Sequence, residues 1–70
     1  MRYTIVVEKG PANFSAYVPD LPGCVAAADT EEETVELMRE AIALHIDDMR
    51  ERGEPIPKPS SFAREIELPA

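Results

Sequence analysis

The sequence has a single cysteine, Cys24, and a single histidine, His45, among its 70 residues. One cysteine excludes an intrachain disulfide, and these two side chains alone cannot supply a zinc-ligand cluster. A domain this short rarely gains more than about 3–5 kcal/mol from one core, so small proteins often add a disulfide, a metal or a second subunit. Because the first two options are excluded, we expect the chain to form a homodimer or a larger oligomer.

Basic residues are also scarce, with seven lysines and arginines against fourteen aspartates and glutamates and a formal net charge of −7. This charge repels the phosphates of nucleic acids and of anionic membranes, which excludes both as direct ligands. It attracts basic proteins and raises the rate at which they are encountered. A negative charge that serves only solubility is the alternative explanation.

The N-terminus lacks a basic segment followed by an apolar run, and no apolar stretch has the length of a membrane span. We therefore expect neither a signal peptide nor a transmembrane helix. A lone cysteine is typical of a reducing compartment, where disulfides are rare. The sequence predicts a cytoplasmic protein.

Alternating apolar side chains predict three short strands in the first 28 residues. Residues 2–9 (RYTIVVEK) and 14–18 (FSAYV) alternate, and residues 24–28 (CVAAA) carry small side chains. The second and third strands are joined by PDLPG, in which Pro22 and Gly23 fit the second and third positions of a type II turn. The pattern predicts an antiparallel meander with room for a helix on its third strand.

The next segment has the signals of an amphipathic helix that begins after Thr30 and ends at Gly53. Thr30 and Glu33 have the spacing of a capping box, and glycine commonly follows a helix C-terminus. Apolar side chains recur every three or four residues, at Val35, Met38, Ile42, Ile46 and Met49, with an adjoining stripe of Leu37, Ala41 and Leu44. We expect this broad face to pack on the sheet and the opposite face to present acids.

The prolines at positions 55, 57 and 59 favour a stiff, extended connector. Residues 62–68 (FAREIEL) then alternate again and predict a fourth strand with Phe62, Ile66 and Leu68 on one side. The predicted fold is an α+β domain over residues 1–70 with the order βββαβ. Its mainly antiparallel sheet has the strand order 3-2-1-4, with strand 4 parallel to strand 1 and one helix across one face.

Catalytic and metal-binding interpretations have little support in the sequence. Cys24 and His45 could form a nucleophile and its base, but a thiol in a strand of small residues is usually a buried apolar group. Glu31 to Glu33 are consecutive and fit a helix cap better than a converging metal site. Asp20 and Asp29 flank the third strand at opposite ends. We predict no catalytic residue, no metal and no cofactor.

The PDLPG turn either only reverses the chain or also contacts a partner. Two prolines make a stiff loop that would display Leu21 beside the charge of Asp20, a combination suited to recognition of a protein. The candidate partner contacts are Asp20 and Leu21 on the turn, with Glu36, Glu40 and Asp47 on the open helix face. The candidate oligomer interface is the apolar side of the last strand, Phe62, Ile66 and Leu68.

Residues 14–60 resemble the N-terminal domain of HicB-type antitoxins and of short stand-alone proteins related to it. The resemblance is carried by the strand that ends at Tyr17, the PDLPGC turn, the DT start of the helix and EAI at residues 40–42. The pattern G-x-x-I-P-x-P-S from Gly53 to Ser60 completes it. It implies a pared-down ribonuclease-H-like βββαβ fold without the ribonuclease active site.

The resemblance also implies a partner, a small basic HicA-type toxin that cleaves messenger RNA and that the antitoxin neutralises. Many full-length HicB-type antitoxins continue into a DNA-binding domain, whereas this chain ends at Ala70, so we expect no operator binding by this chain alone. The first hypothesis is an antitoxin domain that binds such a toxin. The second is a stand-alone oligomeric interaction domain without a toxin, and an enzyme is the third.

Overall fold

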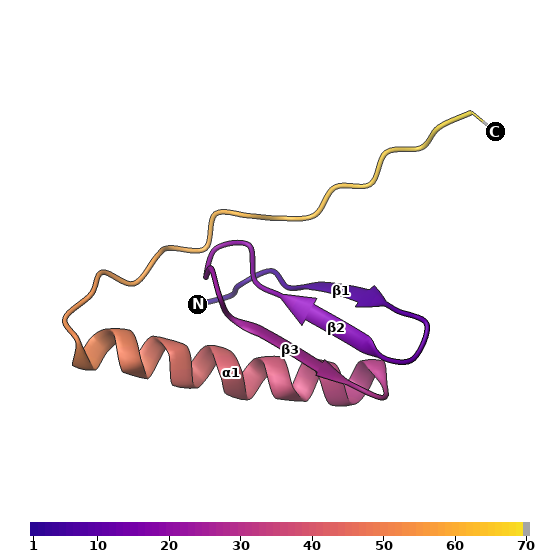
Figure 1. Cartoon of the computed structure of the whole chain (residues 1–70). Helices are drawn as coiled ribbons and strands as arrows, with labels where there is room; N and C mark the ends of the chain where they lie inside the picture. Colours follow the sequence, from indigo (N-terminus) through magenta and orange to yellow (C-terminus); the bar gives the residue numbers. More distant parts are fainter. Residues whose placement is uncertain (70) are drawn as a thin grey trace.

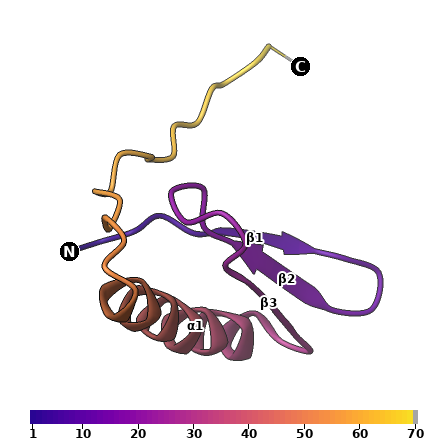
Figure 2. The same ribbon diagram turned by 60° about the vertical axis from the view of Figure 1, so that its left-hand side comes forward.

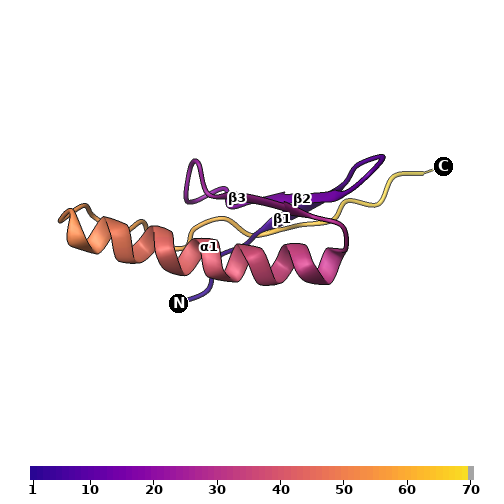
Figure 3. The ribbon, with the colours of Figure 1, turned by 60° about the horizontal axis from the view of Figure 1, so that its bottom comes forward.

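The computed structural model describes residues 1–69, which form a three-stranded sheet covered on one face by one long helix (Figure 1). The elements are β1 (Val6–Lys9), β2 (Phe14–Tyr17), β3 (Val25–Ala28) and α1 (Glu31–Glu51). The sheet is antiparallel throughout, in the order β1-β2-β3. Figure 3 shows the helix running beneath the sheet as a second layer. The α+β class and the βββα order are confirmed.

The strand faces follow the alternation of the sequence. On β2, Ala16 and the following Val18 are buried, whereas Ser15 and Tyr17 are exposed. Ala16 pairs with Val7 of β1 on one side and with Ala26 of β3 on the other. Small side chains in this row let the helix approach the sheet closely, as predicted.

The core lies between the sheet and α1. Its buried apolar members are Ala16, Val18, Leu21, Cys24, Met38, Ile46 and Met49. Tyr3, Ile5 and Val7, which share one side of the alternating first segment, pack against this cluster. The strand itself begins only at Val6, so Tyr3 and Ile5 are held by side-chain packing and not by sheet hydrogen bonds.

Both helix ends carry the predicted caps, with one difference. The Glu33 amide donates to Thr30 Oγ1 at 3.1 Å, but the Glu33 carboxylate accepts from the Thr30 hydroxyl at 3.0 Å and not from the Thr30 amide. At the other end Gly53 has a φ of 69°. Its amide donates to Arg50 O, and the amide of Glu54 donates to Met49 O, which is a Schellman motif.

The packed face of α1 is narrower than predicted. Met38, Ile46 and Met49 are buried and Val35 and Ile42 are half-buried. Leu37 and Leu44, predicted to extend the packed face, are 41% and 70% exposed. A three-stranded sheet covers only one side of the helix, so Leu37 and Leu44 remain in solvent, whereas Ala41 packs against the core.

The predicted fourth strand is wrong for the single chain. Within the described residues, 54–69 form no strand, and the segment from residue 62 onward diverges from β1 (Figures 1 and 2). The radius of gyration is 13.9 Å, against roughly 11 Å for a compact chain of this length. A strand forms only where its backbone meets a partner, and here none is in reach. The place of a fourth strand beside β1 and the ribonuclease-H-like fold stay predictions.

Candidate protein-binding site

The PDLPG segment consists of two consecutive β-turns. Leu21 N–H donates to Val18 O at 3.1 Å, and Cys24 N–H donates to Leu21 O at 3.2 Å. Gly23 has a φ of 86°, which the third position of a type II turn requires, so the predicted turn type is confirmed.

The expectation that this turn displays an apolar side chain is wrong, because Leu21 is only 1% exposed. The first turn folds the loop back over the sheet and directs Leu21 into the core. Leu21 is therefore a packing residue.

Asp20 binds the first part of the C-terminal segment. Its Oδ2 accepts from the amides of Ser60 at 2.9 Å and Ser61 at 3.1 Å. Its Oδ1 accepts from the hydroxyls of the same serines, at 3.1 Å and 2.8 Å. The Ser60 amide, followed by the Ser61 amide and hydroxyl, lowers the pKa of Asp20 from 3.8 to about 2. Both carboxylate oxygens are thus engaged within the chain, and we name this arrangement the Asp20 clamp.

Two further hydrogen bonds hold the same segment to the N-terminal residues. The Tyr3 hydroxyl donates to Pro57 O, and the Thr4 hydroxyl donates to Ser61 O at 2.8 Å. Ser61 is therefore fixed at its amide, its hydroxyl and its carbonyl. The direction in which the chain leaves residue 61 is set by the folded body.

Residues 62–69 are extended and open to solvent. Phe62, Ile66 and Leu68 are 74%, 84% and 76% exposed. These three side chains, the predicted oligomer interface, contribute nothing to the core of the single chain. Single exposed apolar residues are normal, but three in seven residues on an extended backbone indicate a segment that pairs with something else.

The outer side of α1 carries the other predicted contacts. Glu36, Glu40 and Asp47 are all exposed. A shallow hollow of about 370 Å³ lies at the N-terminal half of this side, lined by Glu32, Glu33, Glu36, Leu37 and Glu40. We name the surface formed by Glu36, Leu37, Glu40, Leu44 and Asp47 the acidic helix face. The sequence did not mark Leu37 and Leu44 as surface residues, because their spacing continues the core stripe.

Basic neighbours engage this face only loosely. Arg39 Nε lies 3.6 Å from Glu36 Oε1, and Arg50 Nη1 lies 3.9 Å from Asp47 Oδ1. All four side chains are mostly exposed, and pairs of this kind contribute little to stability. The carboxylates can therefore exchange these arginines for basic groups of another molecule at small cost.

Cys24, the candidate nucleophile, belongs to the buried core cluster. Cys24 is buried, and burial raises the pKa of its thiol, which keeps it protonated and slow to react. Among residues 1–69, no three His, Cys, Asp or Glu side chains come together in a way that would hold a metal ion. The only helical segment within residues 1–69 lacks the apolar length that crossing a membrane requires.

Curated relatives match the chain over almost its whole length. An uncharacterised 14.9 kDa protein of Haemophilus phage HP1 is 39% identical over 69 residues, which cover 99% of this chain and 52% of the phage protein. Antitoxin HicB 2 of Photorhabdus laumondii is 30% identical, with 100% of this chain and 51% of the antitoxin covered. The chain thus spans about half the length of these relatives.

A solved structure has a similar fold. A chain of the HicA3 and HicB3 toxin-antitoxin complex superposes with a TM-score of 0.71 at 33% identity, covering 84% of this chain and 70% of that chain. The family model of HicB-like antitoxins of bacterial toxin-antitoxin systems matches residues 3–70. By this match the chain belongs to the HicB-like antitoxin family.

Proposed function

We propose that this chain is an antitoxin domain that binds and neutralises a small, basic HicA-type toxin in the cytoplasm, without catalytic activity of its own. Membership of the HicB-like family and the similarity to a chain of a HicA3 and HicB3 complex support a role in a toxin-antitoxin system. The observation that carries the proposal for this chain is the acidic helix face, where exposed carboxylates surround two exposed leucines.

The chemistry of this face suits lysine and arginine side chains. The aliphatic stem of such a residue can lie along Leu37, which is 41% exposed, while its cationic head meets the carboxylates of Glu36 and Glu40. The same groups on a ribonuclease would otherwise bind RNA phosphates. An acidic surface that occupies them therefore blocks the RNA substrate.

The proposed contact surface consists of Glu36, Glu40 and Asp47. Asp20 and Leu21, the other two predicted contacts, are left out because the Asp20 clamp and the core already occupy their side chains. The turn instead maintains the shape of the domain.

Co-expression with any short basic reading frame that lies beside this gene tests the proposal. We expect the toxin to arrest growth, the chain to relieve the arrest, and the two proteins to elute together at low salt. The double variant Glu36→Gln, Glu40→Gln removes two exposed charge contacts of about 0.2–1 kcal/mol each. The dissociation constant should rise about 2- to 30-fold, mainly through slower association.

A matched control removes two charges elsewhere. Glu8→Gln with Asp29→Asn leaves the acidic helix face intact, and both positions are exposed. The control should bind toxin as the wild type does, and high salt should weaken binding of every version. Equal losses for the two double variants would show that only net charge matters. Growth arrest without relief, together with no complex at low salt, would refute the toxin-binding role.

We also propose that the chain self-associates through Phe62, Ile66 and Leu68. Their exposure favours the second candidate function, an oligomeric interaction domain that has no toxin. The two candidates differ in gene context. A small basic reading frame with a histidine beside the gene supports the antitoxin, and a neighbourhood without one supports the alternative.

A further inference from the structure

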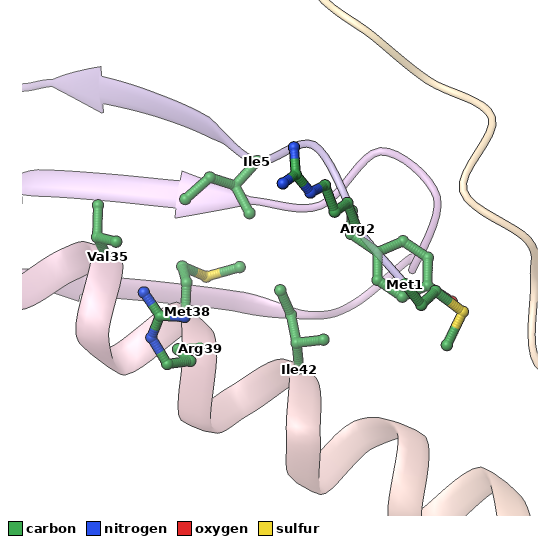
Figure 4. A pocket seen from close by; sticks show the side chains of 8 residues that line it. Met1, Arg2, Ile5, Val35, Met38, Arg39 and Ile42 are labelled. Atoms are coloured by element: carbon green, nitrogen blue, oxygen red, sulfur yellow. The ribbon is translucent and has the colours of Figure 1, made fainter.

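Leu37 and Leu44 form an apolar line along the solvent side of α1. They are seven residues apart, which is about two helical turns or roughly 10.5 Å along the axis. Leu37 is 41% exposed and Leu44 is 70% exposed. In Figure 4 Val35, Met38 and Ile42 extend from the opposite side of α1 toward the sheet. Within the described part of the chain, the core and the side chains packed against it include neither leucine.

The helix positions that border the two leucines are mostly acidic. Residues three and four apart on a helix are surface neighbours. These neighbours include four acids, two uncharged residues and no base: Glu33, Thr34, Glu40, Ala41, Asp47 and Asp48. An apolar centre within a polar rim is the usual layout of a protein interface.

The carboxylates determine which partner fits this layout. They repel a second copy of the chain, whose net charge is also −7, and they attract lysine and arginine side chains. The hollow of about 370 Å³ beside Leu37 can accept such a side chain among its four glutamates. At the leucines themselves the partner must be apolar, because a wholly polar surface would gain nothing by covering them.

We propose that Leu37 and Leu44 are the anchors by which the toxin binds α1, inserted into an apolar groove of the toxin whose borders carry lysines or arginines. In this helix-in-groove mode, apolar residues at helical spacing supply the contact. The contact rests on the proposed toxin binding and gives the two kinds of residue in the acidic helix face separate effects. The carboxylates accelerate association, and the leucines slow dissociation.

The rates of association and dissociation test this contact. Biolayer interferometry with the full chain and a toxin encoded beside the gene measures both rates at several salt concentrations. Leu37→Ala with Leu44→Ala should raise the dissociation constant at least about tenfold, through faster dissociation and with an unchanged salt dependence. Glu36→Gln with Glu40→Gln should instead slow association and weaken its dependence on salt.

Three further variants serve as controls. Val25→Ala shortens an apolar side chain that is 65% exposed on β3 and pairs with the exposed Tyr17, and it should bind as the wild type does. Leu44→Met retains an apolar side chain of similar size and should keep most of the affinity. If the double leucine variant fails to fold by circular dichroism, Leu44→Ala alone replaces it, because Leu44 is the more exposed of the two.

Three outcomes would overturn the role of the leucines. These are unchanged dissociation of the leucine variant, an equal loss for Val25→Ala, and a loss confined to the association rate. In each of them the wild type still binds the toxin, so the proposed function stands. Absence of a wild-type complex at low salt would refute toxin binding itself, and the role of the leucines with it.

Discussion

Replacing Leu21 by alanine should remove most of the stability of the domain. Leu21 is 1% exposed and belongs to the buried cluster. Buried leucine-to-alanine changes cost about 2–5 kcal/mol, with the larger values where the site cannot collapse. Leu21 lies between Pro19 and Pro22 in two hydrogen-bonded turns, so the backbone has little freedom to fill the cavity. We expect a loss of roughly 3 kcal/mol.

This loss is a large part of the total free energy of unfolding of the domain. A single core of this size supplies about 3–5 kcal/mol. For a domain of 60–100 residues, 1 kcal/mol corresponds to about 4–8 °C in Tm, so Tm should fall by roughly 12–24 °C. Thermal unfolding followed by far-ultraviolet circular dichroism measures the shift. It should be recorded at several protein concentrations, because dimerisation also changes Tm.

The matched control is Leu44→Ala on the helix surface. Leu44 is 70% exposed, and surface substitutions usually change stability by within about 0.5 kcal/mol. The toxin affinity of the Leu21→Ala variant, measured at a temperature where this variant is still folded, should equal that of the wild type. An unchanged Tm together with weaker toxin binding would show that Leu21 is an exposed contact, and it would refute the packing argument.

Three local features give further predictions. Folding lowers the pKa of Asp20 from 3.8 to about 2, so the clamp contributes stability that is complete above the unfolded pKa and lost as the pH falls toward 2. The difference in Tm between wild type and Asp20→Asn should therefore be constant near neutral pH and shrink in this acidic window; a difference that persists at pH 2 would contradict it. Burial raises the pKa of the Cys24 thiol, so a disulfide reagent should label it far more slowly in the native protein than in denaturant, and equal rates would show an accessible thiol. Thr30→Ala removes the acceptor of the Glu33 amide and should cost about 0.5–2 kcal/mol in denaturant unfolding, whereas Thr30→Asn, which retains a capping oxygen, should cost much less.

The features that the sequence predicted correctly depend on neighbours along the chain. The type II turn follows from Pro22 and Gly23, and the helix ends follow from Thr30 and Gly53. Each of these signals acts over a few residues, where backbone sterics and single hydrogen bonds decide the conformation. The alternation of residues 14–18 likewise placed Ala16 and Val18, which are buried, on the face opposite Ser15 and Tyr17, which are exposed.

The features that the sequence did not predict depend on contacts between residues that are distant along the chain. Leu21 was expected at the surface because turns usually are, but the first turn folds the loop back over the sheet and directs this side chain into the core. Asp20 was expected to meet a partner, yet its partners are Ser60 and Ser61, forty residues along the chain. The alternation of residues 62–68 shows that they can form a strand but not which edge is within reach. Periodicity carries no information about such distances.

The proposed toxin surface and the proposed self-association residues can act together because they lie on different parts of the chain. With 3.6 residues per turn, Met38 and Ile42 fall on the side of α1 that packs on the sheet, whereas Leu37, Glu40, Leu44 and Asp47 fall on the opposite side. Phe62, Ile66 and Leu68 lie in the C-terminal segment and not on α1, so a dimer formed through them should leave both acidic helix faces exposed. This dimer should bind two toxin molecules, and the mass of the complex by light scattering measures this stoichiometry. A complex with one toxin per dimer would mean that the second copy of the chain and the toxin compete for the same surface.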